Sequence, residues 1–189
     1  MYMPVGYSLG WFEIKTDKTW ELENKIQICD KFVMLDPIIL SIWRGVRGID
    51  PNKSEVIVIQ ELDKLIEKFP YNPKRYTAKN ALEMLIQKGL VIRANSSEEL
   101  FGYLRNFKMI HNGLPDVDRE AVARYELKHV IVSFNEPISV SNLQLDIWRE
   151  ADRMRTFEQI YREKFFCMEP SVFLDSVFYL QKECLLFMA

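Results

Sequence analysis

The sequence predicts an α+β protein built from two related domains, and three observations carry this prediction. The chain has 189 residues, of which 48% are apolar and 28% charged, so it can bury a globular core. Short β-type runs alternate with stretches whose apolar residues recur at helical spacing. The later part of the chain also repeats the pattern of the earlier part, which indicates an internal duplication.

The repeat is clearest at a tryptophan, because Ser-Ile-Trp-Arg at 41–44 recurs as Asp-Ile-Trp-Arg at 146–149. The copies lie 105 residues apart here (148 − 43) but 95 apart at the later pair Leu85 and Leu180 (180 − 85). The second copy has therefore lost ten residues (105 − 95) between these anchors. We place the loss in two loop-like stretches of the first copy that carry glycine, proline and asparagine, 48–53 and 70–73. Their counterparts are the short loops expected at 153–155 and 167–169.

The pattern of each copy predicts a strand followed by three helices. In the first copy, 32–35 is a β-type run, and Asp36 with Pro37 is typical of a helix start that Gly48 then ends. Further helices are expected from about Ser54 to before Pro70 and from Thr77 to Lys88, followed by Gly89 and an extended segment at 90–93. Trp43 and Trp148 lie on the apolar side of each first helix, so we expect both in the core.

The second copy repeats this order after a connecting region. Strands are expected at 128–134 and 138–140 around a turn at 135–137, and helices begin near Ser141, Thr156 and Ser171. The connection holds a helix from Ser96 to about 107, a break at 111–115 and a short helix at 118–125. We place the domain boundary at the break. Domain 1 is then 1–112, with N-terminal strands and a trailing helix, and domain 2 is 113–189.

A small sheet with three helices, the last two joined by a tight turn, resembles the winged-helix (winged helix-turn-helix) superfamily. The order of the motifs points to a smaller group within this superfamily. Each copy has Leu-Asp-Pro or Val-Ser-Asn, a helix with Ile-Trp, a loop, and two further helices, which end in Gly-Leu in the first copy. This order resembles PqqD-like domains, the peptide-recognition elements of modified-peptide biosynthesis. The resemblance covers about 36–92 and 138–187. It implies two tandem winged-helix-like domains that bind a peptide or protein partner.

The resemblance also implies where a peptide would bind. In PqqD-like domains the peptide adds as an extra strand beside the strand before helix one, in a groove against helix three. An exposed strand edge offers unpaired N–H and C=O groups to any peptide backbone, while the groove supplies selectivity. Carried over by position, the peptide-binding residues are Phe32, Val33, Met34, Leu35, Arg75, Lys79 and Met84. In the second copy they are Ile138, Ser139 and Val140, facing Phe173 and Val177.

The second copy departs from the pattern of the first. It has Arg153 where the first copy has Gly48, and Cys184 where the first copy has Gly89. We therefore expect a structural or dimerising role for the second copy, and a homodimer is a candidate state of the protein.

The alternative hypothesis is a DNA-binding transcription regulator. Winged-helix proteins commonly contact DNA through the start of helix three. The first copy offers cations for phosphate and an amide for adenine there: Lys74, Arg75, Tyr76, Lys79 and Asn80. Residues 36–93 hold ten basic and seven acidic side chains, whereas 141–189 hold six and eight. Double-stranded DNA would therefore bind through domain 1 only.

Catalysis is not expected. The sequence lacks the common nucleophile-elbow, phosphate-loop, dinucleotide and zinc-protease motifs, and it has two histidines, so we assign no catalytic residue, metal or cofactor. His111 has no second ligand at metal-binding spacing. The three cysteines are widely spaced, and we expect them reduced and in the core. With no secretory leader pattern and no long apolar run, we expect a cytoplasmic protein without a membrane partner.

Overall fold

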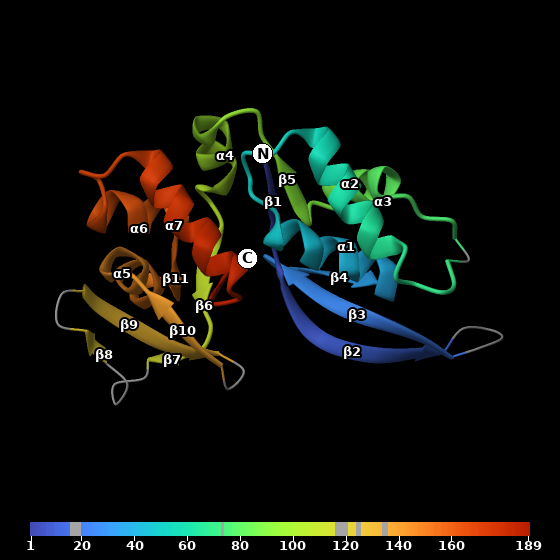
Figure 1. Cartoon of the computed structure of the whole chain (residues 1–189), viewed down its shortest axis with the longest axis horizontal. Helices are drawn as coiled ribbons and strands as arrows, with labels where there is room; N and C mark the ends of the chain where they lie inside the picture. Colours follow the sequence, from blue (N-terminus) through green and yellow to red (C-terminus); the bar gives the residue numbers. More distant parts are fainter. Residues whose placement is uncertain (16–19, 73, 116–120, 124–125, 134–135) are drawn as a thin grey trace. The chain divides into compact units, whose positions relative to one another are not determined.

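The computed structural model describes residues 1–15, 20–72, 74–115, 121–123, 126–133 and 136–189. The chain divides into two compact units (Figure 1). Unit 1 is 1–100 with Ala189, and unit 2 is 101–188. Both combine helices with small antiparallel sheets, so the predicted α+β class is confirmed.

Unit 1 has two small antiparallel sheets and three helices before α4. The first sheet has the strand order β2-β3-β4, and α1 packs against β3 and β4 (Figure 1). The second sheet pairs β1 with β5, so the first and last strands of the unit lie side by side. The bounds are β1 Tyr2–Pro4, β2 Tyr7–Lys15, β3 Trp20–Ile28, β4 Lys31–Leu35, α1 Pro37–Gly48, α2 Glu55–Ile66, α3 Ala78–Gln87, β5 Val91–Arg93 and α4 Ser97–Leu104.

The helices of unit 1 begin where their capping residues predict. The Oδ1 atom of Asp36 accepts from the backbone N–H groups of Ile38 and Ile39 at the start of α1. Thr77 opens α3 in a reciprocal capping box with Asn80. The three helices expected in this copy are therefore confirmed.

Trp43 fixes the core of unit 1. Its side chain is 1% exposed, as predicted, and its Nε1–H donates to the carbonyl oxygens of Val5 (3.1 Å) and Leu90 (3.2 Å). The backbone N–H of Val5 donates to the same Leu90 oxygen at 3.0 Å. The indole thus joins α1 to the segments after β1 and before β5.

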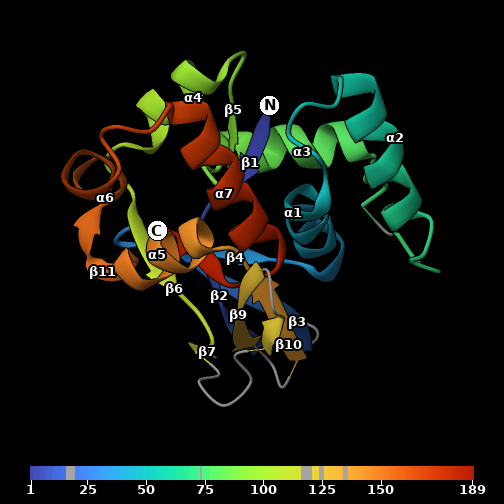
Figure 2. The same ribbon diagram turned by 60° about the vertical axis from the view of Figure 1, so that its left-hand side comes forward.

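Unit 2 has a similar order of elements, with a further strand, β11, between α5 and α6 and two short strands, β7 and β8, where unit 1 has β2. Its strands form one sheet around β9 and another with the order β11-β6-β12, in which β11 and β6 lie side by side (Figure 2). The bounds are β6 Lys108–His111, β7 Leu114–Pro115, β8 Ala121–Ala123, β9 Glu126–Ser133, β10 Glu136–Val140, α5 Asn142–Glu150, β11 Asp152–Thr156, α6 Phe157–Lys164, α7 Pro170–Lys182 and β12 Leu186–Met188.

The two units match in detail. The Nε1–H of Trp148 donates to the Asn112 oxygen at 2.8 Å, and the Asn112 N–H donates to the Leu185 oxygen at 2.8 Å. These bonds repeat those of Trp43, Val5 and Leu90. Strand register is also shared, because Ile26 lies opposite Val33 in unit 1 and Ile131 lies opposite Ile138 in unit 2.

Left-handed backbone recurs at matching places as well. Gly89 has φ 71° after α3, and Cys184 has φ 57° after α7. A non-glycine residue in this conformation is strained by about 1 kcal/mol or more. Unit 2 therefore keeps the backbone geometry of unit 1 although it has lost the glycine.

Three local expectations are wrong. The helix expected at 118–125 is a strand at Ala121–Ala123, which pairs with β9; the rest of that range lies outside the described residues. A turn is expected at 135–137, but Glu136 and Pro137 belong to strand β10. This strand lies at the edge of its sheet, where a proline is tolerated. The loop expected at 153–155 lies in strand β11, whose Arg155 binds Glu150 at 2.6 Å and Asp152 at 3.0 Å.

The expected core position of the cysteines is wrong for two of them. Cys29, in the turn between β3 and β4, and Cys167, between α6 and α7, are exposed, whereas Cys184 is half-buried. All three are free thiols. Turn geometry rather than apolar character decides the position of Cys29, which has φ 49°.

Residues 101–112 belong to unit 2, whereas the boundary expected from the sequence places them in domain 1. Strand β6 is the central strand between β11 and β12. The backbone N–H of Phe157 also donates to the Phe107 oxygen at 2.7 Å. Backbone pairing with a later part of the chain therefore assigns this segment to unit 2.

Candidate functional site

The candidate site is the outer edge of β4. In the sheet order β2-β3-β4, β4 pairs with β3 on one side, and within the described residues no strand pairs with its other side. The edge begins after the two-residue turn at Cys29 and Asp30 and ends at Asp36. An edge of this kind presents backbone donors and acceptors that can pair with another chain.

The side chains of β4 divide between the two faces of the sheet. Leu35 is 2% exposed, and Val33 lies opposite the fully buried Ile26, so these residues face the core. Phe32 lies on the opposite face and is 53% exposed. The Nζ atom of Lys25 stands 4.1 Å from the centroid of the Phe32 ring, which gives this face an aromatic and cationic character.

Unit 2 shows which backbone groups of the edge point outward. The hydroxyl of Tyr179 in α7 donates to the Ser139 carbonyl oxygen in β10 at 2.9 Å, so this oxygen is accessible from the side away from β9. Pro137, two residues earlier, has no N–H to give to β9. In an antiparallel ladder, the N–H and C=O groups of every second residue point to the same side of the strand. Because the register is the same in unit 1, the corresponding residues Phe32 and Met34 direct their N–H and C=O groups away from β3.

Asp36 closes one end of the edge and connects it to the segment before α3. Its Oδ1 atom caps α1, while its Oδ2 atom accepts from the Tyr76 hydroxyl at 2.7 Å. The ammonium of Lys74 lies 3.4 Å from the same Oδ2 atom. One carboxylate therefore fixes both the end of β4 and the start of the third helix.

Asn72 shapes the segment before α3. Its side-chain oxygen accepts from the Tyr76 N–H at 2.9 Å, and its amide donates to the Tyr76 oxygen at 2.9 Å. Within this turn Arg75 has φ 51°, a left-handed conformation, and its side chain is exposed. The turn is thus held by side-chain bonds that leave the Arg75 guanidinium directed to solvent.

The contact with Asp36 changes the ionisation of both partners. Partial burial raises the pKa of Tyr76, and the hydrogen bond to Asp36 and its negative charge raise it further. Partial burial lowers the pKa of Lys74, but the combined effect of Asp36 and Tyr76 outweighs burial, and the pKa is raised. Lys74 is therefore charged and Tyr76 protonated at neutral pH.

The structure places the predicted site residues in three groups. Phe32, Val33, Met34 and Leu35 form β4, and Lys74 and Tyr76 join its end through Asp36. Arg75 and Lys79 are exposed and take part in no ion pair with other described residues, and Met84 is half-buried in α3. Asn80 turns back toward its own helix, because its Oδ1 atom accepts from the Thr77 N–H at 2.8 Å.

Sequence reasoning missed two of the groups that shape the two edges. The sequence predicts Asp36 as a helix cap, but a carboxylate has a second oxygen, and that oxygen accepts from the Tyr76 hydroxyl. Tyr179 was overlooked, although the repeat already aligned it with Met84 through the pair Leu85 and Leu180. The signal for Tyr179 was a polar group in one copy at a position that is apolar in the other.

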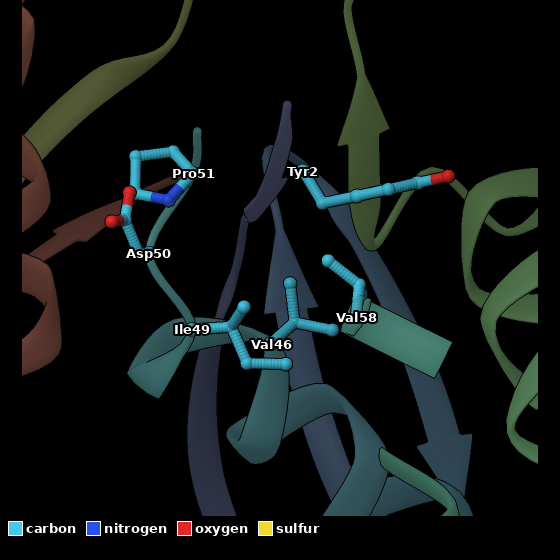
Figure 3. Close-up of a pocket in the computed structure, with 6 residues that line it drawn as sticks. All are labelled: Tyr2, Val46, Ile49, Asp50, Pro51 and Val58. Atoms are coloured by element: carbon cyan, nitrogen blue, oxygen red, sulfur yellow. The ribbon is translucent and has the colours of Figure 1, made fainter. Parts of the chain in front are cut away.

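A crevice on unit 1 does not offer a ligand pocket. It lies beside β1 and its lining comes from β1, α1, α2 and the segment after α1 (Figure 3): Tyr2, Val46, Ile49, Asp50, Pro51 and Val58. The crevice leaves no room for a water-sized sphere, whereas small-molecule sites enclose roughly 300–1,000 Å³. In unit 2 the strand β11 pairs with β6 at the equivalent place.

Two further observations limit the chemistry of the described residues. Nowhere among them do three His, Cys, Asp or Glu side chains gather closely enough to hold a metal ion. Of the helices they form, none has the length and apolar character that a bilayer crossing requires.

Comparison with known proteins gave no match. No protein-family model matches the chain, and neither the curated proteins nor the solved structures include a significant match.

Proposed function

We propose that the protein binds an extended peptide segment of a partner, which adds to unit 1 as a further strand on β4. The observation that carries the proposal is the unpaired edge of β4, where the backbone groups of Phe32 and Met34 face away from β3. Main-chain pairing supplies affinity in this mode of recognition, and neighbouring side chains supply selectivity. The protein acts by binding and not by catalysis.

Side chains around the edge favour an acidic peptide with apolar residues. Phe32 offers an exposed ring beside Lys25, and Lys31 is exposed in the same strand. The exposed Arg75 follows Lys74, which is bound at the end of β4 through Asp36. Exposed cations of this kind attract carboxylates at a distance and raise the association rate.

The architecture proposed for this function is a pair of winged-helix-like domains in tandem, close in layout to PqqD-like domains. Each unit has a small sheet leading into three helices, with a further short strand after the third helix. The shared strand register and the repeated tryptophan bonds support a duplication. A leader-like segment of a partner protein is the ligand that this layout favours.

Selection of binding peptides tests the proposal. A displayed library of random 12-residue peptides would be selected on the full-length chain, and enriched peptides measured by fluorescence anisotropy. Met34→Pro removes an outward N–H without breaking the β3 ladder, so it should weaken binding about tenfold or more. Ser139→Pro is the matched control in unit 2 and should leave binding unchanged. Binding that survives Met34→Pro in a chain with native circular dichroism would refute the β4 edge as the site.

DNA recognition stays the alternative proposal, supported by the exposed cations Arg75 and Lys79. The capping role of Asn80 and the Asp36 contact of Lys74 weaken it, because both groups are already engaged. Anisotropy with a generic 20-base-pair duplex at low salt separates the two proposals. Salt-dependent binding abolished by Arg75→Glu with Lys79→Glu would favour DNA, and absence of duplex binding would remove this alternative.

A further inference from the structure

The two corresponding strand edges differ at the two positions that face outward. Unit 2 has Pro137 where unit 1 has Phe32, so β10 lacks one outward N–H donor. Unit 2 has Ser139 where unit 1 has Met34, and the Ser139 oxygen already accepts from Tyr179 at 2.9 Å. A strand that approached β10 would therefore miss one donor and compete for one acceptor.

Among the described residues of unit 1, no hydrogen bond corresponds to the one from Tyr179. Helices α3 and α7 correspond residue by residue, because their buried positions coincide: Ala78, Ala81, Leu82 and Leu85 match Phe173, Ser176, Val177 and Leu180. This correspondence places Met84 where unit 2 has Tyr179. A thioether has no hydrogen to donate, so α3 cannot bond to β4 from this position.

The Tyr179 hydroxyl is available as a donor over a wide pH range. Partial burial raises its pKa above the ordinary value of 10.0, and the negative charge of Glu183 raises it further. The phenol therefore keeps its proton at neutral pH.

We propose that Pro137 and Tyr179 close the β10 edge to peptides, so that each chain binds one peptide strand, on β4. This inference rests on the proposed function and specifies which of two corresponding edges performs it. Proline and side-chain cover are known means of protecting an edge strand from unwanted pairing. Unit 2 uses both at adjacent outward positions.

A first experiment tests the closing bond without any peptide. The carbonyl carbon of Ser139 would be followed by NMR in the uniformly labelled full-length chain. Tyr179→Phe should shift this resonance, because the carbonyl loses its donor. Tyr161→Phe is the control, since it removes a similar bond, to the Met168 oxygen, elsewhere in unit 2. An unchanged Ser139 resonance in Tyr179→Phe would overturn the proposal.

A second experiment opens the closed edge in a chain whose β4 edge is blocked. The same library of random 12-residue peptides would be selected on Met34→Pro and on Met34→Pro with Pro137→Val and Tyr179→Phe. Restoring one donor and one acceptor should give peptides that bind the opened variant about tenfold more tightly than Met34→Pro. Hydrogen exchange should show that these peptides protect the backbone amides of residues 136–140.

The outcomes separate the two proposals. If wild type binds peptides and the opened variant gains none, the closure of β10 is wrong while the function of β4 stands. If neither binds, the proposed function is wrong, and the inference that rests on it falls as well.

The reverse substitution introduces the closing hydroxyl on α3, at the position that corresponds to Tyr179. Met84→Tyr should weaken the binding of a wild-type-selected peptide about tenfold relative to Met84→Phe, which has the same ring without the hydroxyl. Equal binding by the two variants would overturn the role assigned to the hydroxyl.

Discussion

At the scale of single residues, Asp36 does more than its sequence signature indicates. A helix cap uses one acceptor atom, whereas this carboxylate uses both. Ser141, the corresponding residue of unit 2, caps α5 through its single hydroxyl oxygen. The difference gives unit 1 a link between β4 and the start of α3 that a serine in this position could not supply.

Substitutions at Asp36 should separate these two roles. Asp36→Ala should lower the free energy of unfolding by about 2–3 kcal/mol, because it removes the cap and the contacts to Tyr76 and Lys74. Asp36→Ser keeps a cap and should cost about half as much. Urea unfolding followed by circular dichroism measures both. Equal losses would show that the Oδ2 contacts contribute nothing to stability.

Tyr76 predicts a loss of stability at alkaline pH. Its pKa is raised in the folded state, so the folded chain holds this proton more tightly than the unfolded chain. The resulting stabilisation is complete below the unfolded pKa of about 10 and disappears as the pH rises through the folded value. Urea unfolding at pH 9 and pH 11 should show this decrease, and Tyr76→Phe should reduce it. The same decrease in Tyr76→Phe would contradict the prediction. Tyr2, Lys74 and Tyr179, whose pKa values are also raised, contribute to the remainder.

At the scale of elements, close packing between α1 and α2 depends on Gly45. A Cβ atom at this position would lie 2.4 Å from Cδ1 of Leu65 and 3.0 Å from Cδ2 of Leu62. Both distances are shorter than ordinary contacts, so α2 approaches α1 over a position without a side chain. This close approach is not predictable from the sequence, since a glycine inside a helical pattern usually indicates only a lower helix propensity.

Gly45→Ala should therefore lower the free energy of unfolding by about 1–2 kcal/mol, since the clash outweighs the gain in helix propensity. Gly102 in α4 is the matched control, because a Cβ there meets nothing within 4 Å. Gly102→Ala should raise the free energy of unfolding by up to about 1 kcal/mol. Thermal or urea unfolding of the two variants decides the matter, and a stabilising Gly45→Ala would disprove the packing argument.

Elements with local signals were predictable, and elements that depend on distant partners were not. The helices that begin after Asp36, Thr77, Ser141 and Thr156 start where their caps indicate. Strand β11 lies where the sequence predicts a loop, because 153–155 aligns with the loop-like stretch 48–53 of the first copy. The strand forms by pairing with β6. The same holds for the candidate site. Strand β4 is predicted from its own sequence, whereas the Asp36–Tyr76 and Tyr179–Ser139 bonds are not, because they join residues 40 positions apart.

At the scale of the whole molecule, the division between the units can be tested with fragments. Strand β6 is central to the β11-β6-β12 sheet, and Asn112 accepts the indole bond of Trp148. A fragment of residues 101–189 should therefore unfold cooperatively, whereas 113–189 should not, because it lacks this strand. Urea unfolding by circular dichroism compares the two. Cooperative unfolding of 113–189 would place the boundary at the break near His111.

Charge is also unevenly distributed over the molecule. The segment 36–93 has three more basic than acidic residues (10 − 7), 141–189 has two more acidic than basic residues (8 − 6), and the rest of the chain has three more acidic than basic residues (12 − 9), which gives the total of −2. The segment 36–93 of unit 1 therefore favours an acidic ligand more than the segment 141–189 of unit 2 does. This asymmetry agrees with a single binding edge per chain.

The exposed thiols offer a consequence of a different kind. Cys29 lies in the turn that opens the β4 edge, and Cys167 lies in unit 2 between α6 and α7, while Cys184 is half-buried. A maleimide fluorophore can thus be attached to either unit after replacing the other exposed cysteine with serine. A dye at Cys29 would report an arriving peptide by its change in emission, and a dye at Cys167 would serve as the silent reference on the same chain.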